Sequence, residues 1–411
     1  MAANDRKTVL VTFKPKEQRP EKDKDKLAVM ESCISSRVEF FNAERMSRGV
    51  AVPSGMPKEM IGYDVNEYDA PIVMAQLTEK EMEALRKNRN IEAVEDDAEA
   101  YALGTPGTLD TLSVEGQPSA LAETIPSGVA QIGAPKAWEC GMGHGIKCFV
   151  LDTGIDSDHP DLKDNFKGGI SFVPTESSWK DFNSHGTHCA GTIAATYTGS
   201  GVVGVAPKAY LYAVKVLSAS GSGQYSWIIS GIDWAMKKKG PKIISMSLGG
   251  SSGSTALQKI CEAANKKGVL IVAAAGNAGP PPNTVGYPAK YPTVVAVSAI
   301  GSDNVIAGFS SRGPEVEICA PGVNTLSTIP NKQYGTKSGT SMACPHVSGV
   351  AALAWGTHRF SNNKEIRSLL RATADPLGVA GRDDLYGYGR VDADGAAFHY
   401  MLPLPTYPDI P

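Results

Sequence analysis

The chain lacks the features that would point to a membrane, a nucleic acid or a zinc cluster. No apolar run approaches the roughly 20 residues that a membrane-spanning helix needs. The formal net charge is only −3 over 411 residues, so there is no excess of one sign to attract nucleic acid or an anionic membrane surface. None of the seven cysteines stands in a Cys-x-x-Cys pair. With 42% apolar residues, these absences indicate an ordinary globular protein.

Neither the first residues nor the cysteines assign a cellular compartment. Residues 1–7 do not lead into the apolar segment of a signal peptide, so we expect either that a signal was removed or that there never was one. An odd number of cysteines leaves at least one thiol unpaired unless a bond forms between chains. Cys189 and Cys344 stand among small apolar residues, which favours buried, inert thiols over a second nucleophile.

Composition divides the chain near residue 103. Residues 1–103 hold 36 of the 83 charged residues, although they form only a quarter of the chain, and all five tryptophans come later. Residues 104–121 are rich in Gly, Pro, Ser and Thr and have little periodicity, as an exposed linker does. We therefore expect a charged domain over 1–103, a linker over 104–121 and a larger domain over 122–411.

The first domain has the pattern of a small α+β fold. Its sequence predicts strands over residues 8–13, 38–41, 49–53, 72–77 and 91–94. It also predicts helices over 24–33 and 78–87, the second of which opens with the capping box Thr78-x-x-Glu81. An acidic run, Glu95-Asp96-Asp97, follows the last strand.

The larger domain alternates buried strands with amphipathic helices. Nearly continuous apolar runs over 146–151, 243–248, 269–275 and 294–299 are typical of parallel strands covered on both faces. Helices are predicted over 226–239 and 255–267. The pattern predicts a doubly wound α/β domain with a mostly parallel sheet, whose site lies at the carboxyl ends of the strands.

Three segments carry the residue types that nucleophilic catalysis needs. Asp152 follows the first apolar run, His185 opens His185-Gly186-Thr187-His188, and Ser341 lies just ahead of an apolar helical run over 347–355. A serine hydroxyl is a poor nucleophile, so it needs a neighbouring base and an acid that orients the base. Alone, each residue has a simpler explanation as a turn aspartate, a solvated histidine or a helix N-cap. Pro345 is expected to be tolerated because it lies near the helix start.

The chain order Asp, His, Ser and the motifs around these residues resemble the subtilisin family of serine proteases, which is itself the standard example of this order. The resemblance implies that Ser341 attacks a peptide carbonyl, that His185 takes and returns its proton, and that Asp152 orients the imidazole. It further implies an oxyanion hole formed by the Asn277 side chain and the Ser341 N–H, assisted by Thr340. His188 and His346, in the same motifs, are expected to be structural.

The resemblance also implies how a substrate binds. An extended peptide would pair with the edge segment Ser247, Leu248 and Gly249 by strand addition. An uncharged primary pocket, predicted to prefer Leu, Phe, Tyr or Met before the cleaved bond, would be lined by Ala274, Gly276 and Gly286. Tyr225 would border a second apolar pocket.

By the same resemblance, residues 1–103 are a ferredoxin-like propeptide that assists folding and inhibits the enzyme. Leu103–Gly104 is the predicted self-cleavage bond, and a second cut near residues 120–122 is the alternative, because the segment from Ala122 resembles the usual mature amino terminus. We expect a monomeric zymogen that acts on polypeptides. Export is favoured, since a long inhibitory segment guards the producing cell.

The resemblance implies one structural Ca²⁺ site, because hard oxygen ligands on a loop suit this ion. Its expected ligands are Glu123, Asp161, Thr196, Thr198, Ser200 and Val202, with Thr198 replacing a customary asparagine. A second, weaker family site is not expected, because Gly301 stands where its acidic ligand would be.

Two other functions compete with this hypothesis. One is an inactive homologue that binds peptides, against which the complete set of Asp152, His185, Asn277 and Ser341 argues. The other is an esterase or amidase of small molecules, whose usual Gly-x-Ser-x-Gly elbow is absent at Ser341.

Overall fold

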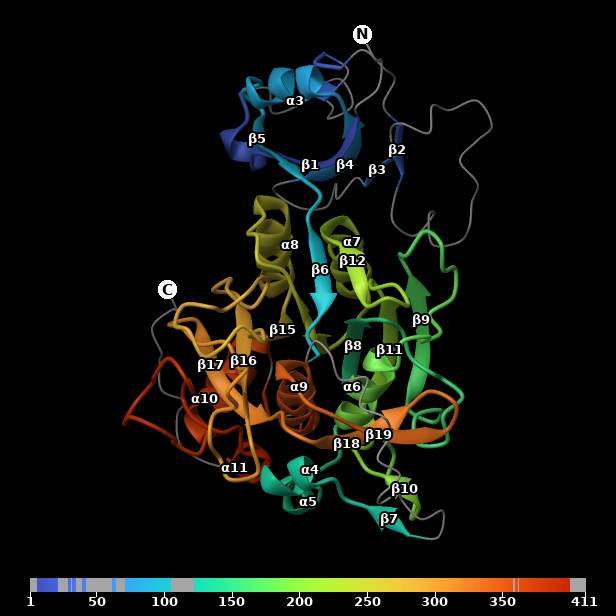
Figure 1. The fold of residues 1–411 in the computed structure, drawn as a ribbon, viewed down its shortest axis with the longest axis vertical. Coiled ribbons are helices and arrows are strands. Elements are labelled where there is room, and N and C mark those ends of the chain that lie inside the picture. The colour runs from blue at the N-terminus through green and yellow to red at the C-terminus, as the bar shows by residue number, and fades with distance from the viewer. Residues whose placement is uncertain are drawn as a thin grey trace.

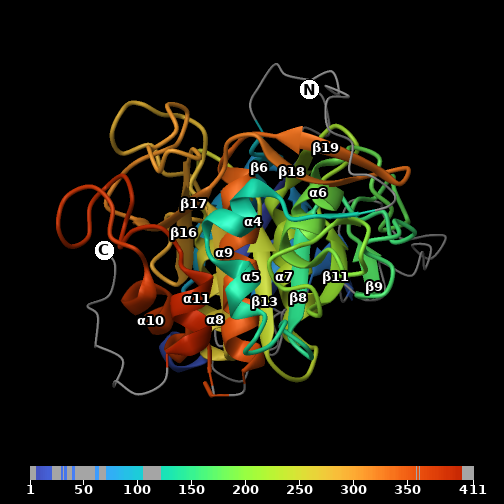
Figure 2. The same ribbon diagram turned by 90° about the horizontal axis from the view of Figure 1, so that it is seen from below.

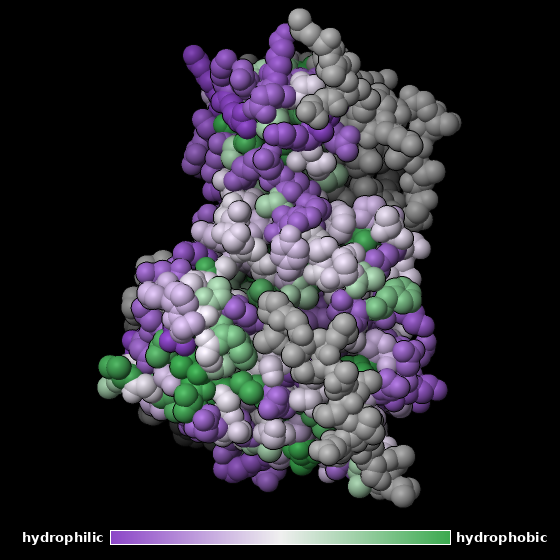
Figure 3. Space-filling model, in the orientation of Figure 1, coloured by the Kyte–Doolittle hydropathy of each residue, from purple (hydrophilic) through white to green (hydrophobic). Residues whose placement is uncertain are grey.

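A computed structural model describes residues 6–20, 29–30, 32–34, 39–41, 61–63, 71–104, 122–357, 359–360 and 362–399. Figure 1 shows a small N-terminal unit stacked on a larger unit, with strand β6 (Glu99–Ala102) running from the first into the second. The charge-rich composition of the N-terminal unit is visible in Figure 3 as a hydrophilic surface at the top of the molecule.

The N-terminal unit is built on an antiparallel sheet. Strand β1 (Lys7–Phe13) lies between β4 (Ile72–Leu77) and β5 (Ile91–Asp96), and helix α3 (Glu79–Arg86) packs on one face. The predicted capping box is present, since Thr78 and Glu81 exchange side chain–backbone hydrogen bonds. Short elements are η1 (Lys16–Gln18), β2 (Glu39–Phe41) and β3 (Ile61–Tyr63). The predicted strand over 49–53 and most of the predicted helix over 24–33 lie outside the described residues.

The larger unit contains a seven-stranded parallel sheet in the order β17-β16-β15-β13-β8-β11-β9. Its strands are β8 (Lys147–Asp152), β9 (Phe166–Ser171), β11 (Tyr210–Lys215), β13 (Lys242–Met246), β15 (Val269–Ala274), β16 (Val294–Ile300) and β17 (Val316–Pro321). The chain leaves β8 toward β11 and β9 and later returns to its other side at β13. The carboxyl end of β8 is therefore a topological switch point, where ligands bind in such sheets.

Alternate strand residues face two helical layers. In β8, Cys148 and Val150 join the core shared with α6 (His185–Ala194) and α9 (Thr340–Gly356). Phe149 and Leu151 join the core shared with α7 (Tyr225–Met236) and α8 (Thr255–Lys266). Figure 2 shows these helices around the sheet from below. The first layer also includes α4 (Ser127–Gln131), α5 (Ala134–Ala137), α10 (Asn363–Thr373) and α11 (Ala393–Phe398). The predicted doubly wound α/β fold is confirmed.

Two predicted elements differ from the structure in their extent. Helix α7 ends at Met236 rather than at Lys239, because Gly240 takes a left-handed φ of 83° and Lys242 Nζ binds the Lys238 and Gly240 carbonyls. The single apolar run over 243–248 divides between β13 and β14 (Leu248–Gly249), which belongs to another sheet.

Smaller pairings complete the larger unit. Strand β6 lies between β12 (Ser222–Gln224) and β14, β7 (Glu123–Thr124) pairs with β10 (Gly201–Val202), and β18 (Thr325–Ile329) forms a hairpin with β19 (Gln333–Lys337). Among the helices of the described residues, none has the length and apolar character needed to cross a membrane.

Candidate active site

Asp152 and His185 meet where β8 ends and α6 begins. His185 Nδ1 lies 2.8 Å and 3.0 Å from the two carboxylate oxygens of Asp152, and both side chains are buried. The Nε2 atom of His185 has no hydrogen-bond partner within the described part of the chain. A carboxylate on Nδ1 holds the tautomer in which Nε2 is free to accept a proton, which is what a general base requires.

Ser341 is the second residue of α9, so the positive end of this helix lies beside it. Its hydroxyl donates to the Ser247 carbonyl at 2.9 Å rather than to His185. The expected reason for tolerating Pro345 is wrong, because Pro345 lies beyond the first turn of α9. Because proline has no N–H, the carbonyl four residues earlier, that of Ser341, loses its helical hydrogen bond. This carbonyl accepts instead from Ser247 Oγ at 2.8 Å and from Cys189 Sγ at 3.5 Å.

Asn277 donates through Nδ2 to the carbonyl oxygen of Leu103 at 2.7 Å. The Asn277 amide is held by Thr340, whose N–H and hydroxyl donate to Asn277 Oδ1 at 2.9 Å and 2.8 Å. Thr340 therefore orients the amide rather than contacting the Leu103 carbonyl itself. Gly339 has a φ of 149°, and a methyl group there would lie 2.6 Å from Leu103 O, so only glycine leaves room for this carbonyl.

Strand β6 lies between two short strands of the larger unit as an added antiparallel strand. Its residues pair with β12 on one side, from Ser222↔Tyr101 to Gln224↔Glu99, and with β14 on the other. Leu103 N–H extends the ladder by donating to Ser247 O at 3.2 Å. Along β6 the side chains alternate, since Ala100 is fully buried whereas Tyr101 is 49% exposed. The Leu103–Gly104 bond is thereby presented at Asn277 in the manner of a bound substrate.

Several of the residues expected to bind substrate, Ser247, Leu248 and Gly249 among them, contact this strand or Leu103. Leu248 and Gly249 pair with Ala102 and Tyr101, and Leu103 Cδ1 lies against Gly249. Leu103 also packs against the core cluster that contains Ala274. Tyr225 N–H donates to Ala98 O, and its buried ring belongs to the same cluster as Ala100. Gly286 N–H donates to Ala275 O, and Gly276 N–H donates to Thr340 Oγ1.

Two carboxylates of the N-terminal unit cap helices of the larger unit. Glu95 accepts from the N–H groups of Thr255 and Ala256 at the start of α8, at 2.8 Å and 3.2 Å. Asp97 accepts from the N–H and hydroxyl of Ser226 at the start of α7, at 2.9 Å and 2.6 Å. Sequence reasoning noted this acidic run but missed its partners, although acidic residues are what helix N-termini attract.

The six expected calcium ligands lie close together. Strands β7 and β10 bring Glu123 beside Gly201, and Asp161 accepts from Val202 N–H at 2.9 Å. Thr196 Oγ1 donates to the backbone carbonyl of Asp161 at 3.0 Å, Thr198 Oγ1 donates to Ser200 O at 3.4 Å, and Gly199 N–H between them donates to Glu123 Oε2. Glu123 Oε1 is buried without a hydrogen-bond partner among the described residues. Burial raises the pKa of Glu123, and the nearby Asp161 charge adds to this shift. A cation would relieve both effects, so this oxygen-rich set fits Ca²⁺.

The other histidines and cysteines near the site are buried and neutral. Burial lowers the pKa of His188 to about 3 and that of His346 to about 4. His188 Nε2 lies 2.9 Å from Thr325 O and His346 Nδ1 lies 2.8 Å from Met342 O, which ties both rings to the backbone. Burial also raises the pKa of the Cys344 thiol to about 11 and holds that of Cys189 well above its usual range. None of the seven cysteines, all of which lie within the described residues, forms a disulfide bond.

Comparison with known proteins agrees with this geometry. Residues 143–389 match the model of the subtilase family. The chain is 46% identical to Subtilisin E of Bacillus subtilis (strain 168) over 327 residues, which cover 79% of this chain and 80% of the relative. It is 50% identical to Subtilisin of Bacillus pumilus over 280 residues, 67% of this chain and 100% of the relative. Thermostable alkaline protease of Halalkalibacterium halodurans is 44% identical over 339 residues, 81% of this chain and 86% of that one. The chain therefore belongs to the subtilase family and is a subtilisin-like serine endopeptidase.

Proposed function

We propose that Asp152, His185 and Ser341 form the catalytic triad. Ser341 Oγ attacks the peptide carbonyl carbon while its proton passes to His185 Nε2, and the carbonyl oxygen becomes an oxyanion on Asn277 Nδ2 and the Ser341 N–H. Collapse expels the amine, which takes the proton from His185 and leaves an acyl group on Ser341. Water, deprotonated by His185, then releases the acid. The Asp152–His185 contact and the hydrogen bond from Asn277 Nδ2 to the Leu103 carbonyl support these roles.

The protein is a self-processing zymogen. Residues 1–103 are its inhibitory propeptide, 104–121 the linker and 122–411 the catalytic domain. The observation that carries this proposal is the Leu103 carbonyl on Asn277 Nδ2, with β6 paired on both sides in the cleft. The same strand occludes the cleft after cleavage, which accounts for inhibition by the bound propeptide.

Specificity is broad, with an apolar preference before the cleaved bond. Leu103 occupies that position here, and its neighbours Gly249 and the cluster around Ala274 carry no charge. A lysine or glutamate would lose hydration there without gaining a partner.

A structural Ca²⁺ ion held by Glu123, Asp161, Thr196, Thr198, Ser200 and Val202 would tie β7 and β10 to the loop that begins after α6. The ion supplies no step of the chemistry. Any second cut near residues 120–122 would be intermolecular, because Glu123 and Thr124 are paired with β10, away from the end of β6 in Figure 1. We further propose that the enzyme is exported and works as a monomer.

Two measurements on the matured wild type, with the uncut Ser341→Ala chain as the control for the first, test the proposal. A fluorophosphonate probe is expected to label the wild type at Ser341 and to leave Ser341→Ala unlabelled. Peptides that differ only before the cleaved bond are expected to show about tenfold or greater preference for Leu over Lys or Glu in kcat/KM. An unlabelled wild type contradicts the triad, and a preference for Lys contradicts the pocket.

A further inference from the structure

Thr153, the residue after Asp152, uses all of its polar atoms in buried hydrogen bonds. Its N–H donates to Asp152 Oδ1 at 2.7 Å. Its hydroxyl donates to Asp181 Oδ1 at 2.9 Å and accepts from Gly186 N–H at 2.9 Å. Its carbonyl accepts from Lys215 Nζ. Thr153 has no exposed surface, so each of these bonds is shielded from water.

Asp181 serves as the cap of the helix that begins with His185. Besides the Thr153 hydroxyl, this buried carboxylate accepts from the N–H groups of Asn183, Ser184 and Thr187 at 2.8, 3.0 and 2.9 Å, and from Thr187 Oγ1 at 2.6 Å. The residue at the N-cap position, Ser184, makes no capping bond and has a left-handed φ of 90°. The start of α6 is therefore fixed by Asp181, by Thr153 and by Asn183, whose Oδ1 accepts from His185 N–H at 3.3 Å, instead of by its own N-cap.

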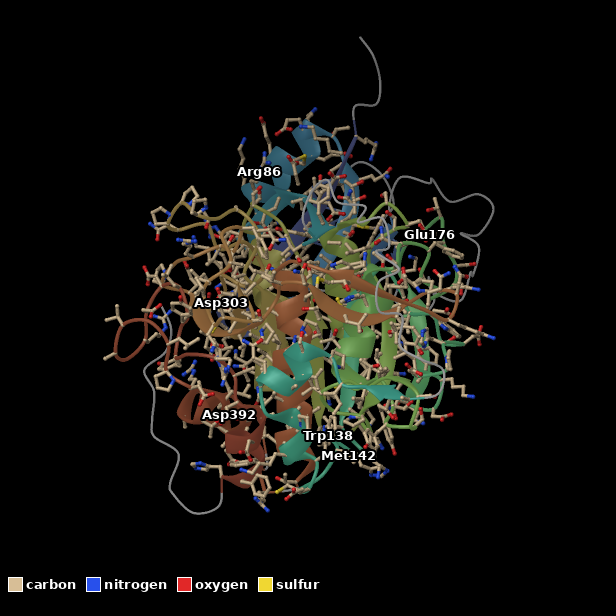
Figure 4. All side chains as sticks on the ribbon, turned by 60° about the horizontal axis from the view of Figure 1, so that its bottom comes forward. Arg86, Trp138, Met142, Glu176, Asp303 and Asp392 are labelled. Atoms are coloured by element: carbon tan, nitrogen blue, oxygen red, sulfur yellow. The ribbon has the colours of Figure 1, made fainter. Side chains whose placement is uncertain are left out.

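Lys215 fixes the other side of Thr153. Its ammonium group is fully buried: Nζ donates to Thr153 O and to Leu217 O at 3.0 Å, and it forms an ion pair with Glu176 Oε2 at 2.9 Å. Glu176 reaches in from the loop after β9 and is labelled in Figure 4. The Asp152 carbonyl is bound in parallel by the N–H groups of Val216 and Leu217, at 3.0 Å and 3.1 Å. The end of β8 thus has little freedom to shift.

The start of α6 also touches the Asp152 segment directly. A methyl group on Gly186 would lie 2.2 Å from Gly154 O and 3.1 Å from Asp152 Cβ. At such close approach, a small displacement of either segment changes the Asp152–His185 distance.

We propose that Thr153 is a positioning residue, which sets His185 against Asp152 by joining the end of β8 to the cap of α6. The inference rests on the proposed triad. The Thr153 hydroxyl connects the two segments through both Gly186 N–H and Asp181, beside a second link in which Asp156 N–H donates to Thr187 Oγ1 at 3.0 Å. Its loss leaves a buried N–H unpaired and removes one donor from a buried carboxylate. Misplacement of a catalytic group by about 1 Å can cost about 10² in rate, so the effect falls on the chemical step.

Self-cleavage of the full-length chain is the sharpest readout. Because β6 is already docked, the first-order rate of cutting at Leu103–Gly104, followed by intact mass, contains no substrate-binding step. Thr153→Val, which replaces only the hydroxyl by a methyl group, is expected to slow this rate by about 10- to 100-fold. Thr153→Ser restores the hydroxyl and is expected to stay within about threefold of the wild type.

Thr328→Val is the matched control. Thr328 is fully buried and its hydroxyl also binds α6, donating to Thr187 O at 2.9 Å, but it does not connect α6 to Asp152. It is expected to lower the unfolding temperature about as much as Thr153→Val and to leave self-cleavage within about threefold of the wild type. Equal slowing by both variants would mean general loosening of α6 and would overturn the proposal.

A spectroscopic signature and a probe separate the remaining outcomes. In the uncleaved Ser341→Ala background, the low-field proton resonance of His185 Nδ1–H is expected to shift or broaden with Thr153→Val and not with Thr328→Val. A wild-type rate and an unchanged resonance in Thr153→Val would overturn the positioning role alone. If the fluorophosphonate probe also fails to label wild-type Ser341, the triad falls and the inference falls with it.

Discussion

The two units of the molecule bury their apolar side chains on very different scales. Among the described residues, the core under α3 contains 13 buried apolar residues, whereas the two cores of the larger unit contain 48 and 34, the latter including Leu10, Ile72 and Ala100 of the N-terminal unit. The sheet of the N-terminal unit is covered by its own helix on one face only. Leu10 and Ile72, from its other face, are members of the core that α7 and α8 form.

Part of the apolar surface of the N-terminal unit is therefore covered by α7 and α8. Small domains bury too little surface to be very stable alone, and this one places part of its apolar surface and two carboxylates on α7 and α8. We propose that this unit acts both as a template for the helices that it caps and as an inhibitor that is lost when it unfolds or is cut away.

We expect the largest difference between the two units in the effect of acid on their stability, because all seven histidines follow residue 103. Burial lowers the pKa of His188 from 6.5 to about 3 and of His346 from 6.5 to about 4. Both histidines are neutral in the folded protein and take up protons in the unfolded chain below pH 6.5. The free energy of unfolding therefore has its full value above pH 6.5 and decreases as the pH falls toward the pKa values of the folded state. The phosphonylated mature enzyme should lose on the order of several kcal/mol of unfolding free energy between pH 7 and 4. His144→Asn, at an exposed histidine, should not change this dependence; a flat profile in the wild type would refute it.

The next largest effect is expected from a substitution at Gly339, where the two units meet. Gly339→Ala places a methyl group 2.6 Å from Leu103 O and 3.2 Å from Asn277 Nδ2, at a φ that disfavours any other residue. Self-cleavage should slow by about 100-fold or more, because the carbonyl no longer reaches the amide. Gly308→Ala, where an added methyl group has nothing within 4 Å, is the matched control and should cleave at the wild-type rate.

Removing the two capping carboxylates should weaken the binding of the N-terminal unit to the larger unit. A helix N-cap contributes about 1 kcal/mol, so Glu95→Gln with Asp97→Asn should weaken inhibition by a separately produced 1–103 segment by roughly 10- to 100-fold. The inhibition constant against the mature enzyme measures this. Asp96→Asn provides the control, since Asp96 lies between the caps and is exposed. An unchanged constant in the double variant would show that the caps contribute nothing to docking.

The smallest expected effect concerns calcium and the larger unit alone. Burial raises the pKa of Glu123, and bound Ca²⁺ requires its ionised form. As pH falls, protons should therefore displace Ca²⁺ beginning at a higher pH than for an ordinary glutamate. Calcium-dependent shifts of the unfolding temperature, recorded against pH for the wild type and Glu123→Gln, test this. A calcium shift in Glu123→Gln equal to that of the wild type would exclude Glu123 as a ligand.

Much of the fold was predictable, because buried parallel strands produce continuous apolar runs and amphipathic helices produce a clear period. The ends of α7 and β13 were not, since they depend on Lys242 binding the carbonyls after α7 and on the transfer of Leu248 to a second sheet. Strand β6 could not be recognised locally. Its pairing exists only because β12 and β14 lie on either side of it.

The candidate site likewise has a part that the sequence predicts and a part that it does not. Asp152, His185, Ser341 and Asn277 stand in recognisable motifs, and the structure brings the first two together and places Asn277 on Leu103. The hydrogen bonds that hold these side chains in place come from residues far apart in the sequence, which stand in no recognisable motif. Lys215 and Asp181 have no signal in the sequence that marks them as buried, because their partners are set by the packing of β11 and α6.

We expect the N-terminal unit to end as the first substrate of the larger unit. To test this, the intact mass of the full-length wild type is followed over time with Ca²⁺ beside Ser341→Ala. A fragment that begins at Gly104 should form in the wild type, and the variant should stay uncut. A wild type that stays whole, or a variant cut at the same bond and rate, would show that Ser341 does not cut this bond.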